Sequence, residues 1–317
     1  MFTVKNTFLT LGLGTSFWLV AFVFMDTRHH YTSGGVTEQS DRLLHYSPSP
    51  SVQNVTHIRI LCWVMTSPAT LNIKGRAVKE TWGKRCDILL FMSSQADPSF
   101  PAIGLDVQEG RDHLWEKTRK AWRYVHEHHL HEADWFMKVD DDTFVIVENL
   151  RHFVRKLDTE EAHFLGRKFK RFGSFNSGGA GYVFSRHALR IFAKLLDDPS
   201  RCKTKARAED VETSRCFQAE GVLAEDTRDE LGRETFHCFR PEHHLIPGFV
   251  PKERWGYKNS FFPYIDGPDC CSDQSISFHY VTPNMMYVLD FLIYRLRPYG
   301  LGGDEVNDID SNMLDKL

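Results

Sequence analysis

The sequence predicts an α/β protein with a mostly parallel central sheet flanked by helices, preceded by a single N-terminal transmembrane helix. Short apolar runs rich in β-branched and aromatic residues alternate with helical patterns, which is typical of a parallel sheet. One of these runs ends in three consecutive aspartates, and ligands of such sheets bind beyond the carboxyl ends of the strands. The 317 residues carry a net charge of -3 and no basic block, which argues against nucleic-acid binding.

The first element is an uncharged apolar run at residues 7–25. As a helix it would extend roughly 28 Å, which is enough to cross a bilayer. A cleaved signal peptide would need small residues at its end, and Phe22 to Met25 offers none, so a retained signal anchor is favoured. We expect a cytoplasmic tail at 1–6, the anchor at 7–25, a flexible polar stem at 26–57, a globular domain at 58–301 and a mobile acidic tail at 302–317.

Every cysteine of the chain follows this anchor, as does the glycosylation sequon at Asn54. The cysteines do not form the paired CxxC motifs of a zinc site, so disulfides in an oxidising lumen are the better interpretation. Their number is odd, which leaves at least one thiol free or bonded elsewhere. Cys270 and Cys271 either bond to each other or to separate partners. The disulfide candidates are Cys62, Cys86, Cys202, Cys216, Cys270 and Cys271.

Strands and helices alternate along the first part of the globular domain. The long helix carries an apolar stripe at helical spacing, and the runs before and after it are short and β-rich. The expected elements are a strand at 58–65, a helix at 76–82, a strand at 88–92, a helix at 111–129 and a central strand at 135–139.

The central strand runs directly into Asp140, Asp141 and Asp142. Adjacent carboxylates repel one another, and a divalent metal that carries a diphosphate would offset this repulsion. A solvated acidic turn or a helix N-cap is the alternative for an arbitrary triplet. The position at the end of a buried strand favours the ligand site.

Three later segments carry polar groups or small residues that indicate a functional site only when they are considered together. They are the small-residue loop 177–185, the acidic pair Glu209-Asp210 and the alternating run 277–281 with His279. Small residues let a backbone approach a ligand closely. Each segment alone is more typical of packing or of a solvated surface.

Together these segments resemble the core 1 β1,3-galactosyltransferases (T-synthases), relatives of the Fringe glycosyltransferases in family 31. The resemblance covers residues 58–300 in the same order, cysteine positions included. It implies a Rossmann-like GT-A fold, Mn²⁺, UDP-galactose as donor and GalNAc α-linked to Ser or Thr of glycoproteins as acceptor. It also implies a type II Golgi membrane protein and a homodimer.

The resemblance also implies roles for individual residues. Asp142, His279 and Asp140 would hold the metal, and Asp210 would be the general base of an inverting transfer. Aromatic faces pack against sugars, although the aromatic run near Trp255 is equally typical of core. Donor contacts would come from Met65, Thr66, Arg76, Lys79, Asp112, Lys138, Asp140 and Asp141. Acceptor contacts would come from Glu209, Gly179, Trp255, Tyr257 and Tyr280.

The chain departs from the family pattern in three places. Residues 211–214 are more polar than expected, the run near Trp255 is less aromatic, and Cys238 replaces an expected proline, which makes it the candidate unpaired thiol. Two alternatives remain: a non-catalytic chaperone-like or inactive paralogue, and a Fringe-like transferase with another UDP-sugar. The chaperone lineage lacks the acidic triplet, which this chain keeps.

Overall fold

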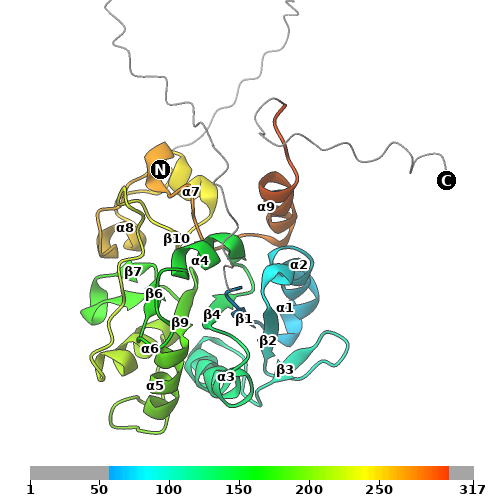
Figure 1. The fold of residues 1–317 in the computed structure, drawn as a ribbon, viewed down its shortest axis with the longest axis vertical. Helices are drawn as coiled ribbons and strands as arrows, with labels where there is room; N and C mark the ends of the chain where they lie inside the picture. The colour runs from blue at the N-terminus through cyan, green and yellow to red at the C-terminus, as the bar shows by residue number, and fades with distance from the viewer. Residues whose placement is uncertain (1–56, 300–317) are drawn as a thin grey trace, which may run out of the picture. The chain divides into compact units, whose positions relative to one another are not determined.

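The computed structural model describes residues 57–299, and its centre is a six-stranded sheet between helices (Figure 1). The strand order is β3-β2-β1-β4-β9-β6. The strands β1 to β4 are mutually parallel, whereas β9 runs antiparallel to both β4 and β6. The predicted mostly parallel α/β sheet is therefore confirmed. The strands are β1 (Ile60–Met65), β2 (Ile88–Ser93), β3 (Ala102–Gly104), β4 (Trp135–Asp140), β6 (Phe164–Gly166) and β9 (Tyr182–Ser185).

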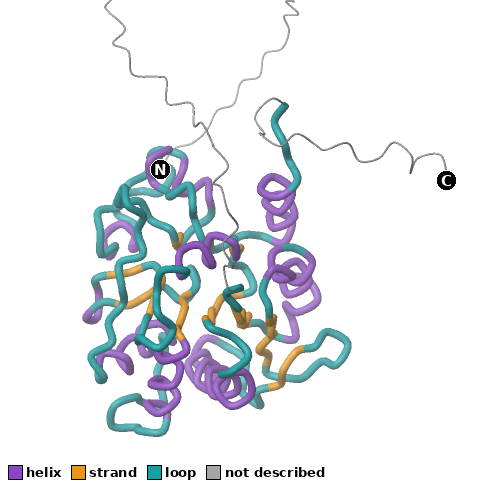
Figure 2. Tube along the Cα trace, in the orientation of Figure 1, coloured by secondary structure: helices purple, strands orange, loops and turns teal. Residues whose placement is uncertain are grey.

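Helices cover both faces of this sheet, and Figure 2 shows the strands between them. In β1, Cys62 and Val64 face a core with α2 and α4, while Leu61 and Trp63 face a core with α3 and α5. A strand buried on both faces reads as a continuous apolar run, which is how the sequence reads there. The main helices are α2 (Arg76–Glu80), α3 (Leu114–His129), α4 (Val147–Val154), α5 (Arg186–Leu196), α6 (Glu209–Gln218) and α9 (Pro283–Tyr294).

The predicted helix at 111–129 begins with a single 3-10 turn, Arg111–His113, and becomes α-helical at Leu114. Its predicted stripe is buried at Thr118, Ala121 and Trp122, where the indole stacks on Phe184 at 4.2 Å between ring centroids. The remaining short helices are α1 (Pro68–Thr70), α7 (Pro241–Leu245) and α8 (Trp255–Asn259).

A smaller three-stranded sheet connects distant parts of the chain, in the order β10-β11-β5. Its strands are β10 (Phe236–His237), β11 (Ser277–Phe278) and β5 (Phe144–Val145). β11 pairs antiparallel with β5, which follows the three aspartates, so the residues just after β11 lie beside them. The other short strands, β7 (Lys168–Phe169) and β8 (Phe175–Asn176), form a separate hairpin.

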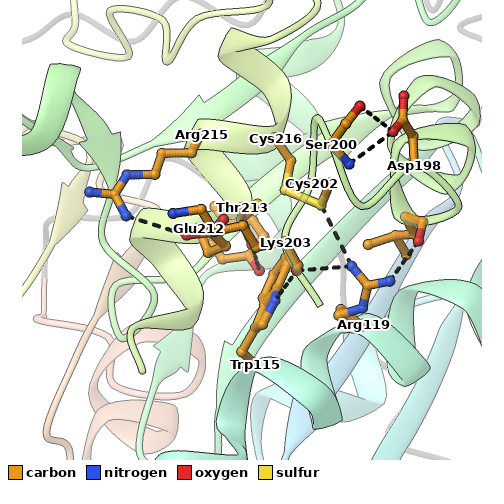
Figure 3. Close-up of a disulfide and its surroundings, with 12 residues drawn as sticks. Trp115, Arg119, Asp198, Ser200, Cys202, Lys203, Glu212, Thr213, Arg215 and Cys216 are labelled. Atoms are coloured by element: carbon orange, nitrogen blue, oxygen red, sulfur yellow. Dashed lines mark hydrogen bonds and ion pairs between the residues drawn. A yellow bond between two sulfur atoms is a disulfide. The ribbon is translucent and has the colours of Figure 1, made fainter. Parts of the chain in front are cut away.

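The sequence did not determine how the cysteines pair. The structure contains three disulfides, Cys62–Cys86, Cys202–Cys216 and the adjacent pair Cys270–Cys271. Cys238 is free and buried. Figure 3 shows the Cys202–Cys216 bond beside α3, where Trp115 Nε1 and Arg119 both donate to the carbonyl oxygen of Lys203. The disulfide therefore fastens the loop before α6 to α6, and these two hydrogen bonds hold the same loop against α3.

The C-terminal helix α9 is unusual in its exposure. It packs beside α2, and its fully buried positions are Met286 and Asp290, the latter paired with Arg85 at 2.7 Å. Its exposed apolar side chains are Tyr287, Val288, Phe291, Leu292 and Ile293. Within residues 57–299 no helix is both long and apolar enough to cross a membrane. The predicted anchor, stem, tail and Asn54 lie outside the described residues.

Candidate functional site

A cleft of about 670 Å³ opens at the carboxyl edge of β1 and β4. Parallel strands end at the same edge, so Met65 and Asp140, which are register partners, both reach it. The loop before β9 lies at this edge because β9 runs in the opposite direction. The first turn of α6 and the residues after β11 complete the wall.

The three consecutive aspartates have different surroundings. Asp140 accepts a hydrogen bond from Lys138 Nζ at 2.7 Å. Asp141 accepts hydrogen bonds from the hydroxyls of Thr66 at 3.0 Å and Thr70 at 2.6 Å. Asp142 lies 3.2 Å from His279 Nε2. All three line the cleft, but only Asp140 and Asp142 lie beside His279, and threonine hydroxyls hold Asp141.

One ligand atom each from Asp140, Asp142 and His279 lies within 4.8 Å of the other two. His279 reaches them because Val281 N donates to the Asp142 carbonyl at 2.8 Å, which continues the pairing of β11 with β5. Two carboxylates and one imidazole suit Mn²⁺, Zn²⁺ or a similar divalent ion better than Ca²⁺, which prefers all-oxygen sites. The donor set therefore fits a divalent metal.

Lys74, which was not among the predicted site residues, places a positive charge beside two of the aspartates. Lys74, on the short helical segment Leu71–Gly75, places Nζ 3.1 Å from Asp142 and 3.3 Å from Asp141. Burial opposes ionisation of Asp142, but the hydrogen bond from His279 and the charge of Lys74 prevail and lower its pKa to about 2. For Asp141, burial prevails and raises the pKa. Asp142 is therefore ionised at neutral pH.

The small-residue loop before β9 makes room for functional side chains. A Cβ at Gly178 would lie 2.1 Å from Glu209 Oε1, and one at Gly179 would lie 2.0 Å from His279 Cε1. Contacts this short do not occur, so larger residues would displace Glu209 and His279. We expected Gly179 to contact a ligand, and the structure adds a packing requirement at that position.

The acidic pair begins α6, and its two carboxyl groups differ. Glu209 is buried and bonds Lys138 Nζ at 2.9 Å and the Tyr182 hydroxyl at 3.1 Å. Burial, together with the negative charges of Asp210 and Asp140, raises the pKa of Glu209 to about 7 despite Lys138. The backbone N–H groups of Gly178 and Val211 donate to Asp210, while burial raises its pKa. Asp210 is thus fixed at the cleft wall.

Phe169, Trp255 and Tyr280 form an aromatic wall of the cleft. Trp255 is 44% exposed, and its ring centroid lies 4.8 Å from that of Phe169. Tyr280 has a φ of 58°, a strained left-handed conformation for a tyrosine, and its ring stacks on His279 at 3.8 Å. Tyr257, which we predicted beside Trp255, is not part of the cleft lining: its ring packs on Tyr264 at 3.9 Å.

Three predicted donor contacts also lie outside the cleft lining. Arg76 and Lys79 lie on the exposed side of α2, where Lys79 Nζ is 5.0 Å from the Phe100 ring centroid. Asp112 is exposed and pairs with Arg207 at 3.1 Å. Met65, Thr66 and Lys138 do line the cleft. Cleft residues that the sequence did not single out include Lys74, Glu109, Arg111, Lys117, Phe169 and Arg207.

Comparisons with known proteins identify the relatives of this chain. Residues 74–220 match the Fringe-like family. The chain is 46% identical over 246 residues to the Xenopus laevis glycoprotein-N-acetylgalactosamine 3-beta-galactosyltransferase 1, covering 77% of this chain and 68% of that protein. It is 29% identical over 171 residues to a mouse beta-1,3-glucosyltransferase, covering 52% of this chain and 33% of that protein. A solved glycosyltransferase involved in glycosylation of the PBCV-1 major capsid aligns with a TM-score of 0.43 at 13% identity, over 74% of this chain and 100% of that one.

Proposed function

The chain belongs to the glycoprotein-N-acetylgalactosamine 3-beta-galactosyltransferase family of Fringe-like proteins, and from this premise we propose its reaction. It transfers galactose from UDP-galactose to the 3-hydroxyl of GalNAc α-linked to Ser or Thr of glycoproteins. The product is a β-linked core 1 disaccharide, formed with inversion at the anomeric carbon. The fold that supports this reaction is of the GT-A type.

One observation carries the proposal. The cleft is lined by a cluster that could bind a metal ion, formed by Asp140, Asp142 and His279. It is also lined by a separate carboxylate, Asp210. An inverting transfer needs a base opposite the leaving group and forms no covalent intermediate. A paralogue that had lost activity would have no requirement to keep both parts. Their joint presence supports an enzyme over a chaperone-like relative.

The cluster would hold Mn²⁺ through Asp142 and His279, with Asp140 beside them. A divalent ion at this position supplies charge stabilisation to the departing diphosphate. Lys74 lies next to Asp142 and carries a positive charge that can bind a phosphate oxygen. The Thr66 and Thr70 hydroxyls hold Asp141 and keep the chain after β4 in position.

Asp210 would take the proton from the acceptor hydroxyl as the oxygen attacks. Two backbone N–H groups fix its carboxylate, and each oxygen keeps a lone pair for a substrate hydroxyl. Its raised pKa makes it a stronger base than an ordinary aspartate. Trp255, Phe169 and Tyr280 form the aromatic wall on which the GalNAc ring would pack.

A donor screen tests the proposal directly. Purified protein is incubated with a GalNAc-Ser/Thr peptide, Mn²⁺ and either UDP-galactose, UDP-GlcNAc or UDP-GalNAc, and the product linkage is read by NMR. Transfer of galactose alone, lost on chelation, is expected. Transfer of another sugar would favour the Fringe-like alternative. No transfer by folded protein that still binds UDP would overturn the enzyme assignment.

The proposal extends to assembly and location. A Golgi membrane protein of type II, anchored by residues 7–25 and with its catalytic domain in the lumen, agrees with the disulfides, which require an oxidising compartment. The exposed apolar face of α9, which carries no exposed charge between Tyr287 and Ile293, supports a homodimer in which this face meets its copy. Sedimentation of Phe291→Glu beside wild type tests this: a monomer is expected, and an unchanged dimer would exclude this face.

A further inference from the structure

A second cluster of side chains that could bind a metal ion lies outside the cleft lining and has no part in the proposed transfer. It consists of His237 at the end of β10, His244 on α7, and Cys271. One potential ligand atom of each lies within 4.8 Å of the others, and the three side chains are at most 8% exposed. A buried set of two imidazoles and one sulfur is a donor set typical of zinc.

The tautomer of His237 follows from its hydrogen bonds. The Ser275 hydroxyl donates to the Ser272 carbonyl at 2.6 Å, so toward His237 Nε2, 2.9 Å away, it can only accept. Nε2 therefore carries the proton, and the lone pair of the buried neutral ring is on Nδ1. That atom faces Cys271 Sγ at 3.8 Å. Histidines that bind metals are oriented in this way, by a hydrogen bond from the other ring nitrogen.

His244 is held in a similar manner. Its Nδ1 shares a hydrogen bond of 2.8 Å with the Tyr264 hydroxyl, and the two rings are stacked. Its Nε2 is buried without a hydrogen-bond partner among the described residues. A buried polar atom without a partner is costly, and a metal ion would satisfy it. Its ring centroid lies 5.0 Å from that of His237.

The disulfide keeps this cluster incomplete, because Cys271 is bonded to Cys270 and a disulfide sulfur is a weak ligand. We propose that opening the Cys270–Cys271 bond creates a site for a zinc-like divalent ion, bound by His237 Nδ1, a ring nitrogen of His244 and the Cys271 thiolate. The adjacent cysteine pair would then be a redox control on metal binding. This inference does not rest on the proposed transferase reaction.

The chemistry requires a dithiol as reductant. The dithiol gives two electrons and two protons to the Cys270–Cys271 bond, which becomes two thiols, while the dithiol is oxidised to its own disulfide. The incoming ion then displaces the Cys271 proton, which leaves to solvent. The new site has one sulfur and two nitrogens, whereas the cleft cluster has two oxygens and one nitrogen, so the two sites prefer different metals.

Cobalt titration of the full-length chain tests the proposal, because Co²⁺ bound by thiolate gives a charge-transfer band that oxygen and nitrogen ligands do not give. Cys270→Ser frees Cys271 without a reductant, and Cys271→Ser is the matched control that frees Cys270 instead. We expect one equivalent of Co²⁺ with the thiolate band in Cys270→Ser and in wild type that has been treated with a dithiol and then separated from it. Untreated wild type and Cys271→Ser should lack the band.

Two further variants test the geometry. In the Cys270→Ser background, His237→Ala should abolish the band, and Ser275→Ala should weaken Co²⁺ binding roughly 10-fold because it frees the His237 ring. An equal band in Cys271→Ser would overturn the proposal, as would its absence from both Cys270→Ser and reduced wild type. Circular dichroism establishes that each sample is folded, and the reduced wild type decides the question if Cys270→Ser does not fold.

Discussion

Lys138 and Glu209 form a buried ion pair, with 2.9 Å between Nζ and Oε1, although one is on β4 and the other begins α6. The same ammonium lies 2.7 Å from Asp140 and donates to the Gly178 carbonyl at 3.1 Å. A single cation thus joins the proposed metal cluster, the glycine loop and the helix that carries the proposed base.

Lys138→Met tests this connection. Removing one member of a buried ion pair leaves the other charge without compensation, and typically costs about 3–5 kcal/mol. We expect a loss of this size in the free energy of unfolding measured with urea. The double variant Lys138→Met/Glu209→Gln should recover part of the loss, since it leaves no unpaired charge at Glu209. A double variant less stable than the single one would mean that the pair is not the cause.

The raised pKa of Glu209 predicts a pH dependence of stability. Burial moves this pKa from its usual 4.5 to about 7, so the folded protein binds the proton more tightly than the unfolded chain. The stability contributed by this proton is complete below pH 4.5 and is lost as the pH rises through about 7. Relative to wild type, Glu209→Gln should gain stability across this window, by at most about 3 kcal/mol. A constant difference between the two proteins from pH 4.5 to 7.5 would contradict the assignment.

Asp210→Asn separates transfer from donor binding. The variant cannot accept a proton, so transfer should fall by at least roughly 100-fold, within the range of general-base effects. UDP affinity measured by calorimetry should stay close to wild type. Burial raises the pKa of Asp210, so the acidic fall of the wild-type rate should occur at higher pH than for an ordinary aspartate. A variant that keeps most of its rate would exclude Asp210 as the base.

Much of this site was predictable because strand ends carry a strong signal. A continuous apolar run followed by Asp140 to Asp142 identifies a central strand and its carboxyl edge, and the structure has both there. The local sequence pattern around His279 does not show that this residue lies beside Asp140 and Asp142. It depends on β11 pairing with β5, two strands of two residues each, which are too short to recognise by alternation.

The predicted site residues that lie outside the cleft lining share a physical explanation. On a short helix, neighbouring residues point in different directions, so sequence proximity does not decide which side chain reaches a cleft. On α8 Trp255 lines the cleft and Tyr257 does not, and near α2 Lys74 lines it while Arg76 and Lys79 do not. Lys74 lies on an irregular helical segment whose sequence has no clear hydrophobic periodicity. Its role can be inferred only from the structure, which places it beside Asp142.

Asp142→Ala should remove metal-dependent donor binding. Asp142 is ionised, contacts both His279 and Lys74, and is the carboxylate best placed in the metal-type cluster. We expect UDP affinity in Mn²⁺ to fall at least roughly 10-fold, the lower end for losses at metal sites, with no detectable transfer. Glu127→Ala is the matched control, because it removes an exposed carboxylate on α3 outside the cleft lining. Unchanged UDP binding by Asp142→Ala in Mn²⁺ would exclude it as a ligand.

Trp255→Ala tests whether the aromatic wall binds the acceptor. Trp255 is 44% exposed and lines the cleft that also holds the carboxylates, so its ring is free for a sugar face to pack on. We expect the KM for a GalNAc-peptide to rise about 10-fold, which corresponds to about 1.4 kcal/mol of lost contact, while UDP affinity stays unchanged. Phe249→Ala removes an aromatic of similar exposure that stacks on His243 outside the cleft lining, and it should leave both values as in wild type. If Trp255→Ala instead weakened UDP binding and left the acceptor KM unchanged, the wall would belong to the donor side of the cleft.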